Sequence, residues 1–162
     1  MPLAVCAASI EHAAEVWFDS GPVIDAVLAS ASVPAALPPT RIGDDHFIDG
    51  GVVNSIPLGE AVSRGADEIF VLQVGRIEEH LEVPAKPSEV GRVAFEIARR
   101  HRFARALASV PDGVTVHVLP YGGRQPGDER LSAYRRLDRT HARMQAAADA
   151  SRAYLEAAGV GR

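Results

Sequence analysis

The stretch FIDGGVVNSIP, at residues 47–57, decides how the rest of this chain is interpreted. A short apolar segment, Phe47-Ile48, leads into Asp49, and two glycines follow. Glycine permits the positive φ angles and the close backbone approach that a sharp turn at a strand end requires. We therefore expect Asp49 at the carboxyl end of a strand, where open α/β sheets place their chemistry. Taken alone, Asp-Gly is also a common pair in simple turns.

Other short motifs surround this stretch. They are FDSG at residues 18–21, ASASVP at 29–34, LPP at 37–39 and GADE at 65–68. The second of them contains an Ala-Ser-x-x-x-Pro element, and the DGG triplet is followed by Asn54-x-x-Pro57. In this order the motifs resemble the patatin-like phospholipase family, from about Pro2 to Val74.

The resemblance implies a fold and a reaction. The fold is of the α/β class: a partial patatin-like three-layer fold with a mainly parallel central sheet flanked by helices. The reaction is hydrolysis of lipid or other acyl esters by a Ser-Asp dyad, with Asp49 as the catalytic aspartate and no metal or other cofactor. The motif-supporting residues are Gly50, Gly51, Ala29, Ser30, Pro34 and Asn54.

The chain departs from the family pattern at the nucleophile. None of its serines lies in a Gly-x-Ser-x-Gly sequence, and no glycine-rich oxyanion loop precedes the Asp49 region. The sequence GGR at 122–124 comes after Asp49, which is the wrong order. We therefore expect residues 1–162 to form a single domain that is the carboxyl-terminal part of a patatin-like acyl hydrolase and is inactive alone. The alternative is a non-catalytic remnant or interaction module that pairs with a partner supplying the nucleophilic half.

Composition narrows the class of protein. With 162 residues and 47% hydrophobic content, the chain is long enough for one domain with a real core. Its net charge of −4 gives no electrostatic case for nucleic acid. Arginines gather in two predicted helices, around residues 99–105 and 135–143. Such a patch can dock on anionic lipid, although a solvated helix face with acids nearby explains it as well and is the interpretation we prefer.

No apolar run approaches membrane-spanning length, so we expect no transmembrane helix. The first residues, MPLAVCA, are apolar but carry no basic leader, and they are typical of a strand rather than a signal peptide. The expected location is cytoplasmic or at the periphery of a membrane.

Periodicity and turn residues predict alternating elements. The expected strands are 3–8, 15–18, 47–49, 68–74 and 114–119, and the expected helices are 23–30, 57–64, 88–110 and 137–158. Residues 34–39 and 77–87 are proline-containing loops. The run EIFVLQV at 68–74 is almost wholly apolar, which favours a central strand buried on both faces.

Several side chains have a structural explanation that we favour over a chemical one. Cys6, the only cysteine, lies in an apolar strand and is expected to be a buried thiol. Asp44, Asp45 and His46 are adjacent at a turn, and adjacent residues rarely converge on one metal ion. Ser30 and Ser32 lack the glycine-flanked turn of a nucleophile.

A chain that lacks the family's amino-terminal strands is expected to expose unpaired strand edges. The candidates are the strands at 3–8 and 68–74. An unpaired edge presents free N–H and C=O groups to another chain. We therefore expect association into a homo-oligomer through such an edge.

Overall fold

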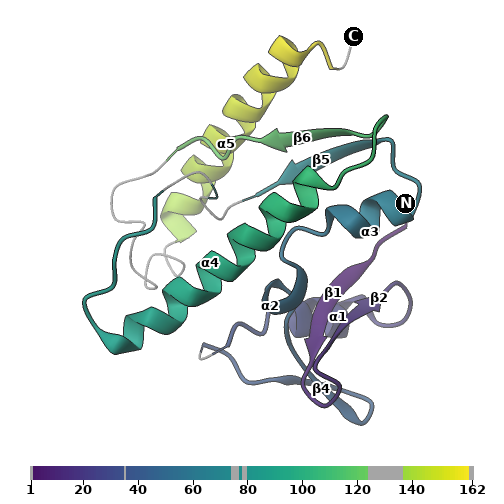
Figure 1. The fold of residues 1–162 in the computed structure, drawn as a ribbon, viewed down its shortest axis with the longest axis vertical. Helices are drawn as coiled ribbons and strands as arrows, with labels where there is room; N and C mark the ends of the chain where they lie inside the picture. Colours follow the sequence, from purple (N-terminus) through teal and green to yellow (C-terminus); the bar gives the residue numbers. More distant parts are fainter. Residues whose placement is uncertain (1, 35, 74–76, 78–79, 124–136, 161–162) are drawn as a thin grey trace. The chain divides into compact units, whose positions relative to one another are not determined.

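The computed structural model describes residues 2–34, 36–73, 77, 80–123 and 137–160 (Figure 1). Internal contacts divide the chain into two units. Unit 1 consists of Met1–Gly65 and His80–Pro111, and unit 2 consists of Ala66–Glu79 and Asp112–Arg162. Each unit has its own sheet, and the two are described separately.

Unit 1 is built on a four-stranded sheet in the order β2-β1-β4-β3. Its elements are β1 (Val5–Ser9), β2 (Ala14–Phe18), α1 (Val23–Ser30), β3 (Thr40–Ile42), β4 (Asp45–Asp49), α2 (Gly51–Asn54), α3 (Leu58–Ser63) and α4 (Pro87–Ala108). All three strand pairs are antiparallel. The turns within β1–β2 and β3–β4 are only a few residues long, and such turns join antiparallel strands, whereas parallel strands need a long crossover.

The predicted α/β class is confirmed, but the expectation of a mainly parallel sheet is wrong for unit 1. Parallel pairing occurs in unit 2, between β5 (Glu68–Leu72) and β6 (Thr115–Leu119). More than forty residues, α4 among them, separate these two strands along the chain, which is ample for a parallel crossover. The pairing direction in each sheet therefore follows from connection length.

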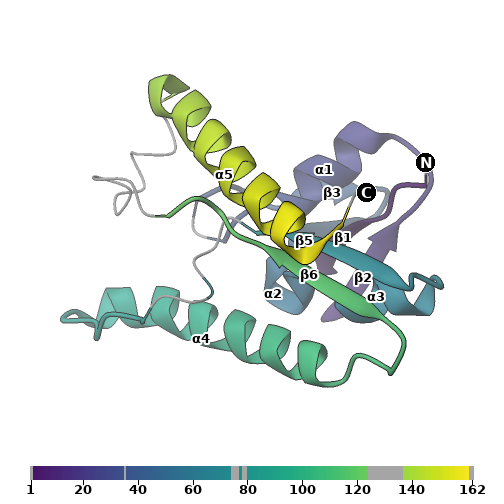
Figure 2. The same cartoon turned by 90° about the horizontal axis from the view of Figure 1, so that it is seen from above.

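The core of unit 1 lies on one face of its sheet. Strand register places Ala7 opposite Val16 and Ser9 opposite Phe47, so their side chains share a face. Ala7 and Phe47 are buried there with Ala29 of α1. The Phe47 ring also meets the Phe18 ring edge-on, with centroids 5.1 Å apart. Small residues on α1 and β1 let the helix approach the sheet closely, and Figure 2 shows α1 and α2 on opposite sides of it.

The carboxylate of Glu11 links the β1–β2 turn to β4. Glu11 lies in the β1–β2 turn, and its two oxygens accept the backbone N–H of His46 at 2.9 Å and contact His46 Nδ1 at 2.7 Å. These hydrogen bonds lower the pKa of Glu11 from its usual 4.5 to about 2. The backbone N–H of Ile10 also donates to the His46 carbonyl, at 2.9 Å. The β1–β2 turn is therefore hydrogen-bonded to both the backbone N–H and the carbonyl of His46 in β4.

Unit 2 pairs its two strands with α5 (Leu137–Ala158). His117 of β6 is buried, and its ring stacks on Phe70 at 5.0 Å and meets Tyr154 of α5 edge-on at 6.0 Å. Ser151 Oγ donates to the Pro120 carbonyl at 3.1 Å, which holds α5 near the end of β6. Among the described residues, no helix is both long and apolar enough to cross a membrane.

Most elements lie where the sequence predicts them. The helices predicted at 23–30 and 137–158 have those bounds in the structure. The prediction missed β3 and α2, which have three and four residues. The strand predicted at 68–74 ends at Leu72, and buried Ile69 and Val71 alternate with exposed neighbours, so it is not buried on both faces. Part of the predicted 77–87 loop and of the second arginine cluster lies outside the described residues.

The expected edge strand at residues 3–8 is also a wrong prediction. The strand at this place, β1, has β2 on one side and β4 on the other, so it is an interior strand. The edges of the unit 1 sheet are β2 and β3, and β5 pairs with β6 alone in its sheet. In α4, Arg99 and Arg100 both contact Glu96, at 2.8 and 3.5 Å, so two arginines of the first cluster have an acid beside them.

The lowered pKa of Glu11 makes a prediction about acid stability. Its folded pKa lies below its unfolded pKa, so the stabilisation is present above pH 4.5 and is lost as pH falls toward 2. Because Glu11 is exposed, we expect Glu11→Gln to lower the free energy of unfolding only slightly at neutral pH and to flatten its decline between these pH values, measured by urea unfolding. Asp44→Asn, in the exposed β3–β4 turn, is the control and should leave the curve unchanged. Identical acid curves for wild type and Glu11→Gln would contradict the assignment.

Candidate functional site

A pocket of about 290 Å³ opens in unit 1 where β4 ends and α2 begins. Its wall includes Cys6, Trp17, Ser30, Asp49 and Asn54. These residues come from β1, β2, α1, β4 and α2, so most of the elements around the sheet contribute one side chain. The pocket combines a carboxylate, a hydroxyl, an amide and an indole ring, which are groups able to bind a polar head and an apolar chain together.

Asp49 is the last residue of β4, as the sequence predicts, and it is half-buried. Its Oδ1 accepts the backbone N–H of Gly51 at 2.6 Å, which fixes the carboxylate on its own turn. Its backbone N–H donates to the Ser32 carbonyl at 3.0 Å. The Ala-Ser-x-x-x-Pro segment therefore lies directly beside Asp49.

Lack of space for a side chain explains the first of the two glycines that follow. Gly50 has a φ of −60°, which any residue can adopt, so the reason for glycine is not a positive φ. A Cβ at Gly50 would lie 2.2 Å from the carbonyl oxygen of Cys6. A Cβ at Gly51 would lie 2.9 Å from Asp49 Oδ1. Gly50 is therefore explained by the close approach of two backbone segments and not by a positive φ angle.

The Ala-Ser-x-x-x-Pro segment supports the pocket in different ways. Ala29 is fully buried against the sheet, and Ser30 is part of the pocket wall. Ser32 Oγ donates to the Leu28 carbonyl at 2.8 Å and lies 2.8 Å from Thr40 Oγ1, so its hydroxyl serves the loop. Pro34 is exposed and is not part of the wall.

Asn54 ends α2 and faces the pocket. Its backbone N–H donates to the Gly50 carbonyl at 2.7 Å, so one helical turn connects it to the glycine beside Asp49. Its side-chain amide contacts the Glu15 carboxylate, which also accepts the indole N–H of Trp17. Sequence reasoning did not identify Glu15 and Trp17. The only signal for them is the alternation of residues along β2, which becomes informative once the pairing Cys6↔Trp17 is known.

Cys6 is half-buried at the floor of this group. Burial, followed in order of effect by the nearby carboxylates of Glu15, Asp49 and Glu60, raises the pKa of its thiol from 9.0 to about 12. A thiol with this pKa is neutral at physiological pH, and the thiolate is the reactive form. The interpretation of Cys6 as structural agrees with this chemistry.

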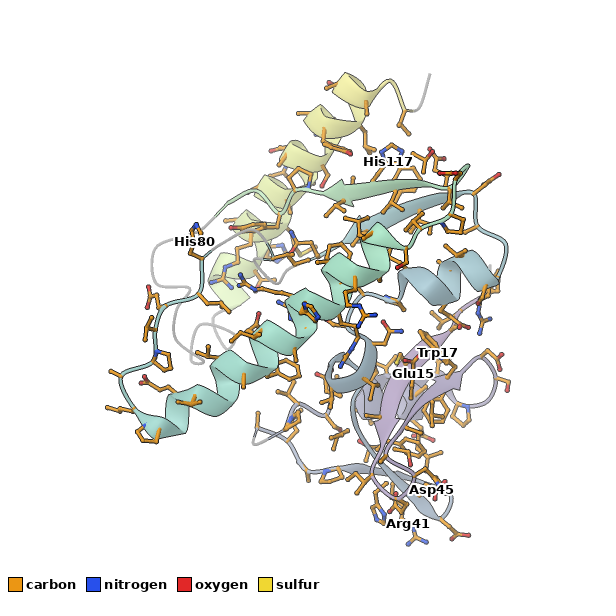
Figure 3. All side chains as sticks on the ribbon, viewed as in Figure 1. Glu15, Trp17, Arg41, Asp45, His80 and His117 are labelled. Atoms are coloured by element: carbon orange, nitrogen blue, oxygen red, sulfur yellow. The ribbon has the colours of Figure 1, made fainter. Side chains whose placement is uncertain are left out.

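The acidic and histidine side chains at the start of β4 contact residues of the β1–β2 turn. His12 Nε2 lies 3.4 Å from Asp45 Oδ1, and His46 contacts Glu11 as described above. Within the described residues, no group of three or more histidine, cysteine, aspartate or glutamate side chains is placed to hold a metal ion. Figure 3 shows Asp45 and Arg41 at the opposite end of the unit 1 sheet from Glu15 and Trp17.

Part of the sequence around this pocket matches a known protein family. The model of the family described as patatin-like phospholipase matches residues 7–62, which carry Asp49 and most of the pocket wall. Residues 7–62 are patatin-like. The resemblance found in the motifs is thereby confirmed for this segment.

Individual relatives are more distant. Uncharacterized NTE family proteins of Mycobacterium bovis and Mycobacterium tuberculosis are each 26% identical over 110 residues, which is 68% of this chain and 30% of theirs. The lysophospholipase NTE1 of Yarrowia lipolytica is 31% identical over 71 residues, which is 44% of this chain and 5% of that protein. The chain thus spans less than a third of the length of the curated relatives that it matches.

The contact between Gly50 and Cys6 can be tested by adding one methyl group. We expect Gly50→Ala to lower the free energy of unfolding by about 1–3 kcal/mol, because the backbone carbonyl of Cys6 cannot move aside without disturbing β1. Gly59→Ala, in α3 with open space around it, is the matched control and should cost nothing. Urea unfolding followed by circular dichroism measures both. Equal free energies of unfolding for the two variants would contradict the close contact between Gly50 and the Cys6 carbonyl oxygen.

Proposed function

We propose that this chain supplies the general base, Asp49, of a patatin-like serine acyl hydrolase that uses a Ser-Asp dyad. The observation that carries the proposal is the placement of Asp49 at the end of β4, with one oxygen held by Gly51 and the side chain facing a pocket. Support also comes from the family match, which covers this residue. Gly50, Gly51, Ala29, Ser30 and Asn54 build the turn and the wall around it.

The proposed reaction divides the work between Asp49 and a serine outside this chain. Asp49 accepts the serine proton through Oδ2, since Oδ1 is bonded to Gly51, and the serine oxygen attacks the acyl carbonyl carbon. Asp49 then returns the proton to the leaving alkoxide, which departs as an alcohol and leaves an acyl-serine. A water molecule gives a proton to Asp49 while its oxygen attacks the acyl-serine carbonyl carbon, and Asp49 returns that proton to the departing serine oxygen, which releases a carboxylic acid and restores both the serine and the Asp49 carboxylate.

The remaining parts of this machinery are assigned to other residues. The sequence holds no Gly-x-Ser-x-Gly, so the nucleophile and the oxyanion donors come from a preceding segment or a separate chain. Each of these groups is worth orders of magnitude in rate, so this chain alone is inactive. The substrate is a fatty-acyl ester such as a phospholipid or lysophospholipid, which agrees with the name of the Yarrowia relative. Such a substrate brings the protein into peripheral contact with a membrane.

A second candidate function is a non-catalytic interaction module. It is favoured by the outer face of α1, where Val23, Ile24, Val27 and Leu28 are all about half exposed or more. A short helix that is apolar on both faces is usually covered by another element. In this proposal the face pairs with a partner that supplies the nucleophilic half or, in a homo-oligomer, with another copy of the chain.

Probe labelling tests whether the chain contains a nucleophile of its own. We expect the 162-residue chain to remain unlabelled by a fluorophosphonate, because Ser32 is engaged by Leu28 and Ser30 lies in a helix without flanking glycines. Mass spectrometry after incubation measures labelling, and a serine hydrolase under the same conditions confirms that the probe is active. Stoichiometric modification of Ser30 or Ser32 would overturn the proposed division of the dyad.

The role of Asp49 requires the protein in which a Gly-x-Ser-x-Gly half accompanies this chain. There we expect Asp49→Asn to lower kcat by about a hundredfold or more toward a chromogenic short-chain ester, because the amide keeps the shape and loses the base. Asp45→Asn is the matched control, since it lies on the same strand and sheet face but at the far end, against His12. Similar activity of the two variants would remove Asp49 from the reaction.

A further inference from the structure

A second carboxylate, Glu15, lies behind the pocket wall and binds two residues of that wall. Its Oε1 accepts the indole N–H of Trp17 at 2.6 Å. Asn54 Nδ2 lies 3.2 Å from Oε1 and 3.2 Å from Oε2 of the same carboxylate. Figure 3 shows Glu15 and Trp17 side by side on the sheet. Glu15 itself does not line the pocket.

Strand register explains why these groups meet. In β2, Glu15 and Trp17 are two residues apart and so share one face of the sheet, opposite to the face that carries Ala7 and Phe47. Trp17 pairs with Cys6 of β1 on that face. The helix α2 contacts β1 and β2 and brings Asn54 to the same place. Glu15 therefore connects the hairpin with the helix that begins at Gly51.

Through Asn54, this connection reaches the turn of Asp49. The Asn54 N–H donates to the Gly50 carbonyl, and the Gly51 N–H donates to Asp49 Oδ1. We propose that Glu15 is a positioning residue of the pocket, whose carboxylate orients Trp17 and Asn54 and thereby steadies the Asp49 turn. Only the effect on turnover rests on the proposed function; the orientation of the two side chains does not.

Hydrogen-bond chemistry determines what this arrangement offers a ligand. An ionised carboxylate only accepts, so it selects the Asn54 amide orientation with Nδ2 toward Glu15 and directs the amide oxygen, Oδ1, away from that carboxylate as an acceptor. The indole N–H, the only polar group of the Trp17 side chain, is satisfied by Glu15, so the ring presents apolar surface. The pocket wall then combines the apolar Trp17 ring with one hydrogen-bond acceptor, Asn54 Oδ1. This combination suits a ligand with an acyl chain and a head group that carries a hydroxyl.

Glu15 is exposed, which makes it suitable for replacement. Hydrogen bonds and charges at exposed sites contribute little to the free energy of unfolding, so Glu15 variants should fold with stability close to that of the wild type. An effect on the pocket can then be separated from an effect on folding. Trp17 is the only tryptophan in the chain, so its fluorescence reports on this site alone.

Three variants test the proposed orientation in the free chain. Glu15→Ala removes the acceptor, and Asn54→Asp places two carboxylates face to face. The double variant Glu15→Gln/Asn54→Asp exchanges amide and carboxylate, so the amide introduced in β2 can accept from the indole and donate to the carboxylate introduced in α2. Glu11→Gln is the matched control, because Glu11 lies in the same hairpin but contacts His46.

We expect acrylamide quenching of Trp17 to increase in Glu15→Ala and in Asn54→Asp, to return toward the wild-type value in the double variant, and to be unchanged in Glu11→Gln. A second readout is the pH dependence of Cys6 alkylation, which should begin at lower pH in Glu15→Ala because a negative charge near the thiol is lost. Unchanged quenching in Glu15→Ala, or equal quenching in Asn54→Asp and the double variant, would overturn the proposal.

Turnover separates this inference from the proposed function. In the protein that includes the nucleophilic half, we expect kcat/KM to fall about tenfold in Asn54→Asp and to recover in the double variant, since small misplacements of catalytic groups are costly. If the fluorescence pattern holds but Asp49→Asn leaves turnover intact, the hydrolase proposal fails and the positioning of Trp17 and Asn54 stands. If Asp49→Asn is inactive and the fluorescence pattern is absent, the role of Glu15 fails alone.

Discussion

The contact between the Gly50 backbone and the carbonyl oxygen of Cys6 is the constraint on which the site depends. A Cβ at Gly50 would come within 2.2 Å of that oxygen, so the chain can cross β1 here only as glycine. The crossing turns the chain from β4 into α2 within two residues. It thereby leaves Asp49 at the strand end, Gly51 in reach of its carboxylate, and Asn54 one turn further along.

The same close approach sets the electrostatics. Because α2 packs on β1 and β2, it adds the Asn54 amide to a group that already holds the half-buried Cys6 thiol and the carboxylates of Glu15 and Asp49. Glu15 and Asp49 both act on Cys6, and together with burial they raise its pKa to about 12. The thiol is therefore a neutral neighbour for Asp49. A neutral thiol at that position places no additional charge beside the Asp49 carboxylate.

Sequence alone predicts what depends on local chemistry. The end of β4 at Asp49 follows from an apolar pair, an acid and two glycines, and α1 follows from its proline start and apolar spacing. Register is not local, and so Glu15 and Trp17 were not recognised as site residues before Cys6↔Trp17 was known. The family resemblance implies a mainly parallel sheet, but the short β1–β2 turn joins antiparallel strands, and the four-stranded sheet is antiparallel. Very short elements such as β3 carry too few residues for a periodic signal.

A segment that carries a carboxylate such as Asp49 has simpler structural requirements than one that carries a nucleophile elbow. A nucleophile elbow stores strain and needs a surrounding fold to hold it. Asp49 needs only a strand end and one N–H donor, and this chain provides both within residues 45–51. Its orientation is therefore set by contacts within this chain. In the proposed hydrolase, preorganisation of this kind would lower the cost of assembling the site from two pieces.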